Sequence, residues 1–421
     1  MKSPRLLRTI IRLSLLAAVV SGSLIFASSA DAAENWPGWR GPRGDGSVEN
    51  GSLPTSFEVA RDVIWKVPMP GTGHASPIIW EDRIFLVDAI EDTAERLLLC
   101  LERETGKTLW QKTVLESPFE DIHRLNSRAS STPLTDGERV YVSFLDKTEM
   151  FVAAYDFDGK KLWETRPGDF SSKHGYCSSP VLWKDTIIVN GDHDGDAYLV
   201  SLDRKTGETI WKVDRPNKTR SYCTPIIRHI DGRDQLILSG SKCVASYDPS
   251  TGEQHWIIDG PTEQYVASLV YNRDENLLFL TCGFPSKHLM GIRPDGRGNV
   301  TDSHVAWHEQ VGAAYVPSPV AVGPYFLVVA DNGVASCFIA KTGERLWRER
   351  LPGQHSASAI TANGLAYFLS DAGILSVIEP GPEFDVVAQS ELGEETYASP
   401  AVYEGRFYLR AIDHLYCLGA R

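Results

Sequence analysis

The chain repeats one pattern of polar and apolar positions, and its clearest copy is YLVSLDRKTGETIW, residues 198–211. Residues 198–203 alternate between two faces, which is the period of a β-strand. Thr206-Gly207 predicts a turn, because glycine supplies the positive φ that a tight hairpin needs. The segment that follows is a second strand anchored by Trp211. The pattern therefore predicts a β-hairpin with one large aromatic residue near its end.

Copies of this hairpin recur along the chain, and a tryptophan closes each of them. These anchors lie about 40 to 53 residues apart, at Trp65, Trp110, Trp163, Trp211, Trp256, Trp307 and Trp347. Self-similarity at this period is typical of propellers and solenoids built from supersecondary units. No segment has a sustained helical period, which disfavours an α/β solenoid.

A second marker, Ser-Pro or Thr-Pro, lies between the hairpins and opens a strand each time. It occurs at Ser76-Pro77, Thr132-Pro133, Ser179-Pro180, Thr224-Pro225, Ser318-Pro319 and Ser399-Pro400, while Ser268-Leu269 and Ser358-Ala359 fill the two gaps. Proline is tolerated at the first residue of a strand, and a second strand usually follows the marker. We therefore expect eight units of four short antiparallel strands.

The two ends of this repeat predict how the units close into a ring. The eighth unit ends at residues 414–418 with no room for a fourth strand, whereas the first tryptophan segment, residues 63–67, has no three strands before it. We predict an all-β, eight-bladed β-propeller of four-stranded antiparallel blades, closed by pairing of the N-terminal strand with the last blade. The seventh blade would end on a strand without tryptophan, residues 386–393. Closure leaves only short protected edges.

Residues 1–33 have the organisation of a cleavable signal peptide. Basic residues come first, an apolar run follows at residues 13–27, and Ala30-Asp31-Ala32 resembles a signal-peptidase site. Serine and glycine interrupt the apolar run, which disfavours a retained membrane anchor, and no cysteine is present for a lipid anchor. We expect a periplasmic or secreted protein in which residues 34–62 form an irregular arm and residues 63–421 form the propeller.

The charge of the chain argues against two classes of partner. Its formal net charge is −13 at pH 7, and loss of the basic leader would make it more acidic. An acidic exported protein is a poor partner for nucleic acid or for an anionic membrane surface. We expect a protein or a small-molecule ligand at one face of the propeller.

The seven cysteines are an odd number for a disulfide framework. Cys100, Cys337 and Cys417 occupy equivalent strand positions, which favours small buried core residues. Cys177 and Cys223 each precede a strand opening in successive units, so a disulfide between these two is an open alternative.

The arm contains a stretch rich in glycine and proline, NWPGWRGPRGDG at residues 35–46, with Trp36 and Trp39 as its large apolar side chains. We expect these tryptophans to pack on the propeller. A tail that binds a partner is the alternative.

The repeated unit, as in SLDRKTGETIW and SYDPSTGEQHW, resembles the pyrroloquinoline quinone (PQQ) repeat. That repeat is shared by quinoprotein dehydrogenases and by outer-membrane assembly proteins of the BamB type, and the resemblance covers residues 63–418. It implies an eight-bladed ring whose tryptophans dock between adjacent blades. With WPGWRGPRGDG at its N-terminus, the chain looks most like secreted PQQ-repeat proteins of planctomycete-type bacteria.

The resemblance implies a fold more firmly than a function. The dehydrogenases place a vicinal disulfide over the quinone, and this chain has no adjacent cysteines; they are also longer, with insertions that build the cofactor chamber. We therefore expect a non-catalytic binding or scaffold module. The alternative is a PQQ-dependent, alcohol dehydrogenase-like oxidoreductase with a reduced active site, in which PQQ and calcium would be the cofactors. Whether the protein is an enzyme stays open.

The residues just before each strand opening are expected at the mouth of the central channel. They are His74, Arg128, Tyr176, Tyr222, Tyr265, Tyr315, His355 and Tyr397. Tyrosine and histidine combine a ring face with a polar tip, which suits a planar or polar ligand or a peptide loop. Arg128 adds local positive charge and points to an anionic group such as a carboxylate. The alternative is that the tyrosines simply fill a narrow channel.

One acidic cluster invites a metal-site hypothesis. Asp192, Asp194 and Asp196 alternate around Gly195, as oxygen ligands do in calcium loops. The cluster also falls where the repeat needs a hairpin turn, and Asp and Gly are ordinary turn residues. A plain turn is the alternative interpretation.

Overall fold

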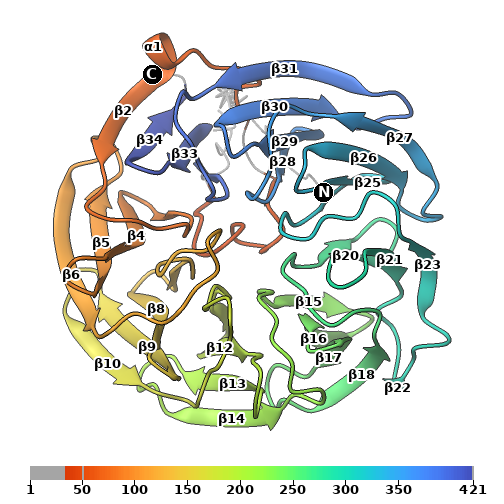
Figure 1. Cartoon of the computed structure of the whole chain (residues 1–421), viewed down its shortest axis with the longest axis horizontal. Helices are drawn as coiled ribbons and strands as arrows, with labels where there is room; N and C mark the ends of the chain where they lie inside the picture. The colour runs from red at the N-terminus through yellow and green to blue at the C-terminus, as the bar shows by residue number, and fades with distance from the viewer. Residues whose placement is uncertain (1–33, 50–51, 420–421) are drawn as a thin grey trace, which may run out of the picture. The chain divides into compact units, whose positions relative to one another are not determined.

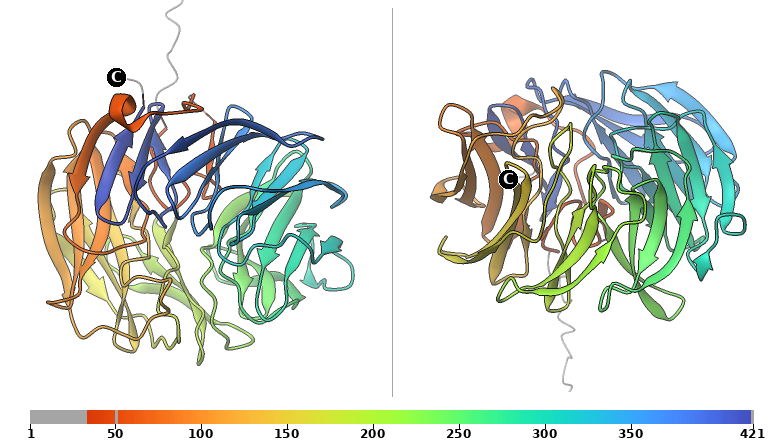
Figure 2. Two further views of the ribbon diagram at one scale, coloured as in Figure 1. Left: turned by 45° about the horizontal axis from the view of Figure 1, so that its top comes forward. Right: turned by 60° about the horizontal axis from the view of Figure 1, so that its bottom comes forward.

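The computed structural model describes residues 34–49 and 52–419, so the predicted signal peptide at residues 1–33 lies outside the described residues. The described residues form a ring of eight β-sheets, arranged as the blades of a propeller around a central axis (Figures 1 and 2). The predicted fold class is therefore confirmed. The described part of the chain contains no helix that combines the length and the apolar character needed to span a membrane.

Blades 1 to 8 follow chain order, and each sheet runs outward from the axis. Blade 1 contains β3 (Ile78–Trp80), β4 (Arg83–Ile90), β5 (Glu95–Glu102) and β6 (Thr108–Glu116), and blade 2 contains β7 (Leu134–Thr135), β8 (Arg139–Asp146), β9 (Glu149–Asp156) and β10 (Lys161–Thr165). Blade 3 contains β11 (Val181–Trp183), β12 (Thr186–Gly191), β13 (Tyr198–Asp203) and β14 (Thr209–Asp214), and blade 4 contains β15 (Ile226–Ile230), β16 (Arg233–Gly240), β17 (Cys243–Tyr247) and β18 (Gln254–Asp259).

Blades 5 to 8 repeat the arrangement. Blade 5 contains β19 (Val270–Asn272), β20 (Leu277–Cys282), β21 (His288–Ile292) and β23 (Val305–Glu309), and blade 6 contains β24 (Val320–Val322), β25 (Tyr325–Val329), β26 (Val334–Ile339) and β27 (Arg345–Arg350). Blade 7 contains β28 (Ile360–Ala362), β29 (Leu365–Leu369), β30 (Ile374–Glu379) and β31 (Asp385–Glu391), and blade 8 contains β32 (Ala401–Tyr403), β33 (Arg406–Arg410), β34 (His414–Leu418) and β2 (Val63–Pro68). Two short parallel strands are additions: β22 (Gly298–Asn299) pairs with β18, and β1 (Ser47–Val48) pairs with β28.

The ring closes as the sequence predicts. Strand β2, just after the short helix α1 (Val59–Asp62), pairs antiparallel with β34, and Trp65 lies opposite Cys417. The N-terminal strand thus completes blade 8 and leaves no open seam between the first and last blades. A buried ion pair reinforces this seam, because Arg410 of blade 8 reaches Asp88 of blade 1 at 3.3 Å and both side chains are fully buried.

The tryptophans sit between blades, and each donates its indole N–H to a backbone carbonyl of the next blade. The acceptors of Trp65, Trp110, Trp163, Trp211, Trp256, Trp307 and Trp347 are, in order, the carbonyls of Arg103, Phe157, Arg204, Pro249, Pro294, Ala340 and Gly381. For five of the seven tryptophans, a turn glycine of the next blade lies under the ring: Gly106, Gly159, Gly207, Gly252 and Gly343. At Gly207, which has φ 75°, a Cβ would lie 2.5 Å from Trp163. The Thr-Gly turn and the tryptophan of the repeat are therefore two halves of one contact between neighbouring blades.

The strand openers form a second, inner contact ring around the axis. In seven of the eight junctions, the backbone N–H of the opening Ser or Thr donates to the hydroxyl of the opening residue in the next blade, at 2.9–3.0 Å. The accepting hydroxyls, called the hydroxyl belt below, belong to Thr132, Ser179, Thr224, Ser268, Ser318, Ser358 and Ser399. The marker that indicates a strand start in the sequence thus also ties the blades together at their inner edges.

The N-terminal arm packs on the propeller and crosses the middle of the ring, where it is the red segment in Figure 1. Trp36 exchanges two backbone hydrogen bonds with Ile79 of blade 1, and Arg40 donates to the carbonyls of Pro319 and Ala359 at blades 6 and 7. Asp45 pairs with Arg228 of blade 4 at 2.8 Å. The arm therefore ties distant blades together on the side of the ring opposite the loops that precede the strand openers.

Candidate functional site: a cup on the propeller axis

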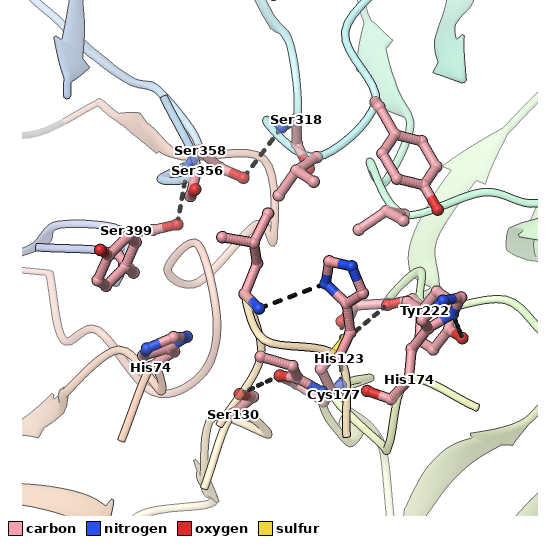
Figure 3. A pocket seen from close by; sticks show the side chains of 18 of the residues that line it. His74, His123, Ser130, His174, Cys177, Tyr222, Ser318, Ser356, Ser358 and Ser399 are labelled. Atoms are coloured by element: carbon pink, nitrogen blue, oxygen red, sulfur yellow. Dashed lines mark hydrogen bonds between the residues drawn. The ribbon is translucent and has the colours of Figure 1, made fainter. Parts of the chain in front are cut away.

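The central channel contains a cavity of about 270 Å³, and Trp39 of the arm lines its arm-side end, called the floor below. Figure 3 shows part of the lining, with His123, His174 and Tyr222 among the labelled side chains. This volume is just below the range of small-molecule sites, roughly 300–1,000 Å³. A second cavity of about 250 Å³ lies between the arm and blades 1 to 4, and Trp39 and Thr224 line both. Trp39 thus lies between the two spaces, and the cavity on the axis is called the cup below.

Four of the eight predicted mouth residues line the cup: His74, Tyr222, Tyr315 and Tyr397. The rings of His74 and Tyr397 face each other with their centroids 4.8 Å apart. Burial, with the nearby Arg410 charge, lowers the pKa of His74 to about 4. His74 is therefore neutral at pH 7 and offers a ring face and one N–H rather than a charge.

The other four predicted residues do not line the cup. Tyr176 and Tyr265 are buried, and their hydroxyls bond to Ser143 Oγ and to the Gly260 carbonyl. His355 is buried, and neither of its ring nitrogens has a hydrogen-bond partner in the described residues. Arg128 pairs with Glu91 at 2.8 Å and stacks on Phe119. Loop residues three or four positions before the marker thus divide between the cup and the space behind it.

Two histidines that the sequence analysis did not select stand at the mouth. His174 Nδ1 lies 2.8 Å from Tyr222 Oη and 3.1 Å from Gln264 Nε2, and the His123 ring packs edge-on against it at 5.2 Å. Burial is the largest of the effects that lower the pKa of His174, and the nearby Arg220 charge adds to it. His174 lies two residues before Tyr176, so extending the same mouth criterion by one position on that loop would have found it.

His123 comes from the long loop between β6 and β7, which also brings Leu125, Asn126 and Ser130 to the cup. The side chain of Leu125 is 48% exposed. Asn126 donates to the His174 carbonyl at 2.7 Å and accepts from Ser130 at 2.6 Å. This loop has no equivalent in the repeat pattern, so its contribution has no periodic signal in the sequence.

Six belt hydroxyls form the lower wall of the cup: Thr132, Ser179, Thr224, Ser318, Ser358 and Ser399. Figure 3 shows Ser318, Ser358 and Ser399 side by side on one wall, linked by hydrogen bonds. The signal for them was in the sequence, because a hydroxyl residue recurs at all eight strand openings.

The lining of the cup has few charged side chains. Among the described residues that line it, Asp331 is the one acidic side chain, and there is no lysine or arginine. Asp331 accepts the backbone N–H groups of Tyr315 and Val316 at 2.8 and 3.0 Å, which fixes the loop that carries Tyr315.

Each of the three aspartates in the acidic cluster pairs with a different cationic side chain. Asp192 is fully buried and pairs with Arg215 at 2.8 Å, Asp194 pairs with Arg220 at 2.6 Å, and Asp196 pairs with Lys218. Across the described residues, no group of three or more His, Cys, Asp or Glu side chains is placed to hold a metal ion. The three carboxylates therefore have separate arginine and lysine partners.

All seven cysteines lie in the described residues and are free, so the alternative disulfide between Cys177 and Cys223 does not form. Cys100, Cys337 and Cys417 are buried, as predicted. Cys177 lines the cup, and burial raises the pKa of its thiol to about 12. A thiol with so high a pKa is almost entirely protonated at neutral pH and is a weak nucleophile.

Comparison with known proteins agrees with the PQQ-like repeat recognised in the sequence. The family model for outer membrane protein assembly factor BamB matches residues 58–147 and 94–269, and the chain belongs to this family of PQQ-like β-propellers. BamB of Burkholderia pseudomallei is 30% identical over 116 residues, which are 27% of this chain and 30% of that protein. The quinoprotein ethanol dehydrogenase of Pseudomonas aeruginosa is 23% identical over 244 residues, or 55% of this chain and 36% of that enzyme.

The fold is also that of solved structures. The crystal structure of BamB from Moraxella catarrhalis superposes with a TM-score of 0.59 at 12% identity, covering 85% of this chain and 97% of that one. The chain matches about a third of the length of its curated relatives, 36% and 30% in these two cases. Relatives of this family thus include both an assembly factor and dehydrogenases.

The cup does not fit the quinone that those dehydrogenases imply. PQQ carries three carboxylates, and buried carboxylates need cationic or hydrogen-bonded partners. The described lining has no lysine or arginine to meet three of them, and no three-ligand metal set lies in the described residues. The chain also has no adjacent cysteines to cover a bound quinone.

Proposed function

We propose that this protein is an exported, non-catalytic binding module that holds a small ligand with an aromatic or apolar body in the axial cup. One observation carries the proposal: the axial cavity is lined by Trp39 of the arm at one end and by ring side chains at its mouth. Such a lining buries a flat apolar surface and offers hydrogen bonds at its edge. Export rests on the signal-peptide pattern of residues 1–33.

The experiment is a calorimetric titration of the mature protein with three phenyl probes of similar size: benzoate, benzamide and benzylammonium. We expect at least one to bind with a dissociation constant of about 100 μM or tighter. A Tyr315→Ala/Tyr397→Ala double variant should lose that binding, because it removes two ring faces from the cup. Tyr325→Ala is the control, since Tyr325 is half-buried on β25 and does not line the cup. Failure of all three probes, or full binding by the double variant, would refute the proposal.

The oxidoreductase alternative is tested in the same instrument with PQQ, in the presence and absence of calcium. The proposal expects no binding of PQQ below about 100 μM, because the cup has too few cationic groups for three carboxylates. Micromolar binding that depends on calcium would favour the quinone-dependent alternative and would contradict the argument from the missing cationic groups.

A protein partner at the same mouth is a second candidate, favoured by exposed apolar side chains. Leu125, Phe284, Val311 and Ile412 are 38–50% exposed and belong to loops at the mouth end of the blades. The backbone of Phe284 bridges to that of Gln264, which lines the cup. A photocrosslinking amino acid at position 284 should capture a defined partner in cells, whereas one at Ile210, 53% exposed on β14, should not. Equal adducts at both positions would refute a mouth-specific partner.

A further inference from the structure

The lower wall of the cup, next to its floor, is a ring of hydroxyl groups whose protons are unused. Each belt hydroxyl accepts a backbone N–H from the preceding blade, so its oxygen is already a hydrogen-bond acceptor. A Ser or Thr hydroxyl has one O–H to donate. No belt hydroxyl donates to an acceptor among the described residues. Six of these O–H donors line the cup and are available to a ligand.

A positive charge without a contacting counterion lies just beneath this ring. The side chain of Arg40 is fully buried, and its Nη2 donates to the carbonyls of Pro319 and Ala359, the residues that follow Ser318 and Ser358 of the belt. Its Nε and Nη1 have no partner in the described residues. The nearby carboxylate of Asp45 is held by Arg228 at 2.8 Å and by Ser47.

The electrostatic balance at Arg40 follows from these contacts. Burial lowers the pKa of Arg40 to about 10, Asp45 opposes that shift, and Arg228 adds to it. The guanidinium is still charged at pH 7, and its charge is only partly compensated. A negative group placed above it would be attracted through a water-poor floor, where charges interact more strongly than in water.

We infer that the belt hydroxyls over Arg40 form a carboxylate-binding subsite, and that the ligand of the cup is a small organic monocarboxylic acid inserted acid end first. Convergent neutral donors bind a carboxylate through charge-assisted hydrogen bonds, which are roughly twice as strong as neutral ones. The aromatic mouth then covers the body of the acid. One carboxylate is accommodated at the floor, while the rest of the lining, whose one acidic side chain is Asp331, has no lysine or arginine for further ones.

The inference rests on the proposed function, and the same probes separate the two. Benzoate and benzamide share their shape and differ in charge at one end. We expect benzoate to bind at least tenfold more tightly than benzamide, and benzylammonium more weakly than either. If benzamide binds equally well and still requires Tyr315 and Tyr397, the cup stands and the carboxylate subsite is refuted.

The belt supplies its own matched control. Ser318 and Ser268 have the same structural role, since each accepts a backbone N–H at 3.0 or 2.9 Å, but only Ser318 lines the cup. We expect Ser318→Ala and Ser358→Ala each to weaken benzoate binding about fivefold to tenfold and to leave benzamide binding within about threefold. Ser268→Ala should lower the thermal midpoint by a similar amount without changing benzoate binding. Equal losses of benzoate binding in Ser268→Ala and Ser318→Ala would overturn the inference.

Arg40 has a test of its own. Arg40→Gln removes the charge and keeps most of the side-chain volume, so benzoate binding should fall at least tenfold while benzamide binding is little changed. If Arg40→Gln does not fold, the serine variants decide the question without it. Benzoate binding unchanged in a folded Arg40→Gln protein would remove Arg40 from the subsite.

Discussion

At the scale of single residues, the propeller depends on one paired contact, an indole on one blade against a turn glycine on the next. Gly252 has φ 75°, and a Cβ there would lie 2.8 Å from Trp211, whose N–H bonds to the neighbouring Pro249 carbonyl. Glycine at this turn is therefore required twice, by the backbone conformation and by the ring beneath it.

This double requirement can be measured by comparing two glycines. Gly252→Ala should lower the free energy of unfolding by about 2–4 kcal/mol, because the strain of a positive φ adds to overpacking against Trp211. Gly232 has φ 77° and open space around its Cα, so Gly232→Ala should cost only about 1–2 kcal/mol. Urea unfolding of both variants checks this, and equal costs would show that the indole contact contributes nothing.

Residues of this kind are the part of the molecule that the sequence predicts well. The tryptophans, turn glycines and strand openers recur, so their period alone identifies them in the sequence. His123 and His174 do not recur, and they reach the cup from loops whose lengths differ between blades. The sequence of a loop outside the repeated unit follows no period, so the period cannot identify its functional residues. Only the folded ring shows which of its side chains point toward the channel.

At the scale of elements, the closing strand β2 is fastened by one carboxylate as well as by its ladder. Glu394 accepts hydrogen bonds from Tyr416 Oη at 2.6 Å and from His414 Nδ1 at 2.9 Å on β34, and Lys66 of β2 lies 3.3 Å away. Burial raises the pKa of Glu394, but the hydrogen bonds from Tyr416, the Asp413 N–H, His414 and Lys66 outweigh it and lower the pKa to about 2.

This carboxylate predicts an acid-sensitive closure. A carboxyl group whose pKa is lower in the folded state stabilises the fold above its unfolded pKa and ceases to do so as the pH falls through that range. The free energy of unfolding of the wild type should therefore exceed that of Glu394→Gln by about 1–2 kcal/mol at pH 7. This difference should disappear as the pH falls from about 4.5 to about 2. Chemical unfolding from pH 7 to pH 2.5 measures it, with the exposed Glu391→Gln as control. A gap that is constant with pH would contradict the role of the ionised carboxylate.

The junction between blades 7 and 8 shows how the arm replaces a missing repeat element. Strand β31 has no tryptophan, as predicted, and blade 8 has no Thr-Gly turn because its last strand comes from the other end of the chain. Phe57 fills this place: its side chain is buried in one cluster with Tyr367 and Phe407, and its N–H bonds to Ser390 Oγ at 2.8 Å. The absence of the tryptophan was evident in the sequence, but its substitute was not.

If Phe57 takes the place of a docking tryptophan, its removal should cost as much as that of a core aromatic residue. We expect Phe57→Ala to lower the free energy of unfolding by about 3–5 kcal/mol through lost burial and a residual cavity. Phe284→Ala is the matched control, because that phenylalanine is 50% exposed and its loss should change stability by no more than about 0.5 kcal/mol. Similar losses of unfolding free energy for the two variants in urea would show that Phe57 does not stabilise the junction between blades 7 and 8.

At the scale of the whole molecule, closure converts eight marginal sheets into one cooperative ring. Each blade alone is a small sheet with exposed faces, and only its neighbours bury them. The sequence predicted the number of blades and the route of closure because both follow from counting eight strand openers against seven tryptophans. It did not predict that the arm floors the channel, since Trp39 and Arg40 lie in an irregular segment whose course depends on the finished ring.

Deleting Val63–Pro68 should therefore affect the whole ring. Without β2, the edge of β34 is unpaired and the Trp65 contact to the Arg103 carbonyl is lost, so blade 8 no longer holds blade 1. An exposed strand edge is a template for pairing with other chains, and we expect the deleted protein to elute as oligomers in size-exclusion chromatography and to unfold at lower temperature.

A synthetic peptide covering residues 58–69, added during refolding, should restore the monomer by supplying the missing strand in trans. A scrambled peptide of the same composition should not, because the register that sets Trp65 opposite Cys417 would be absent. A deleted protein that stays monomeric and as stable as the full chain would show that the ring closes by the buried Asp88–Arg410 pair and blade packing alone.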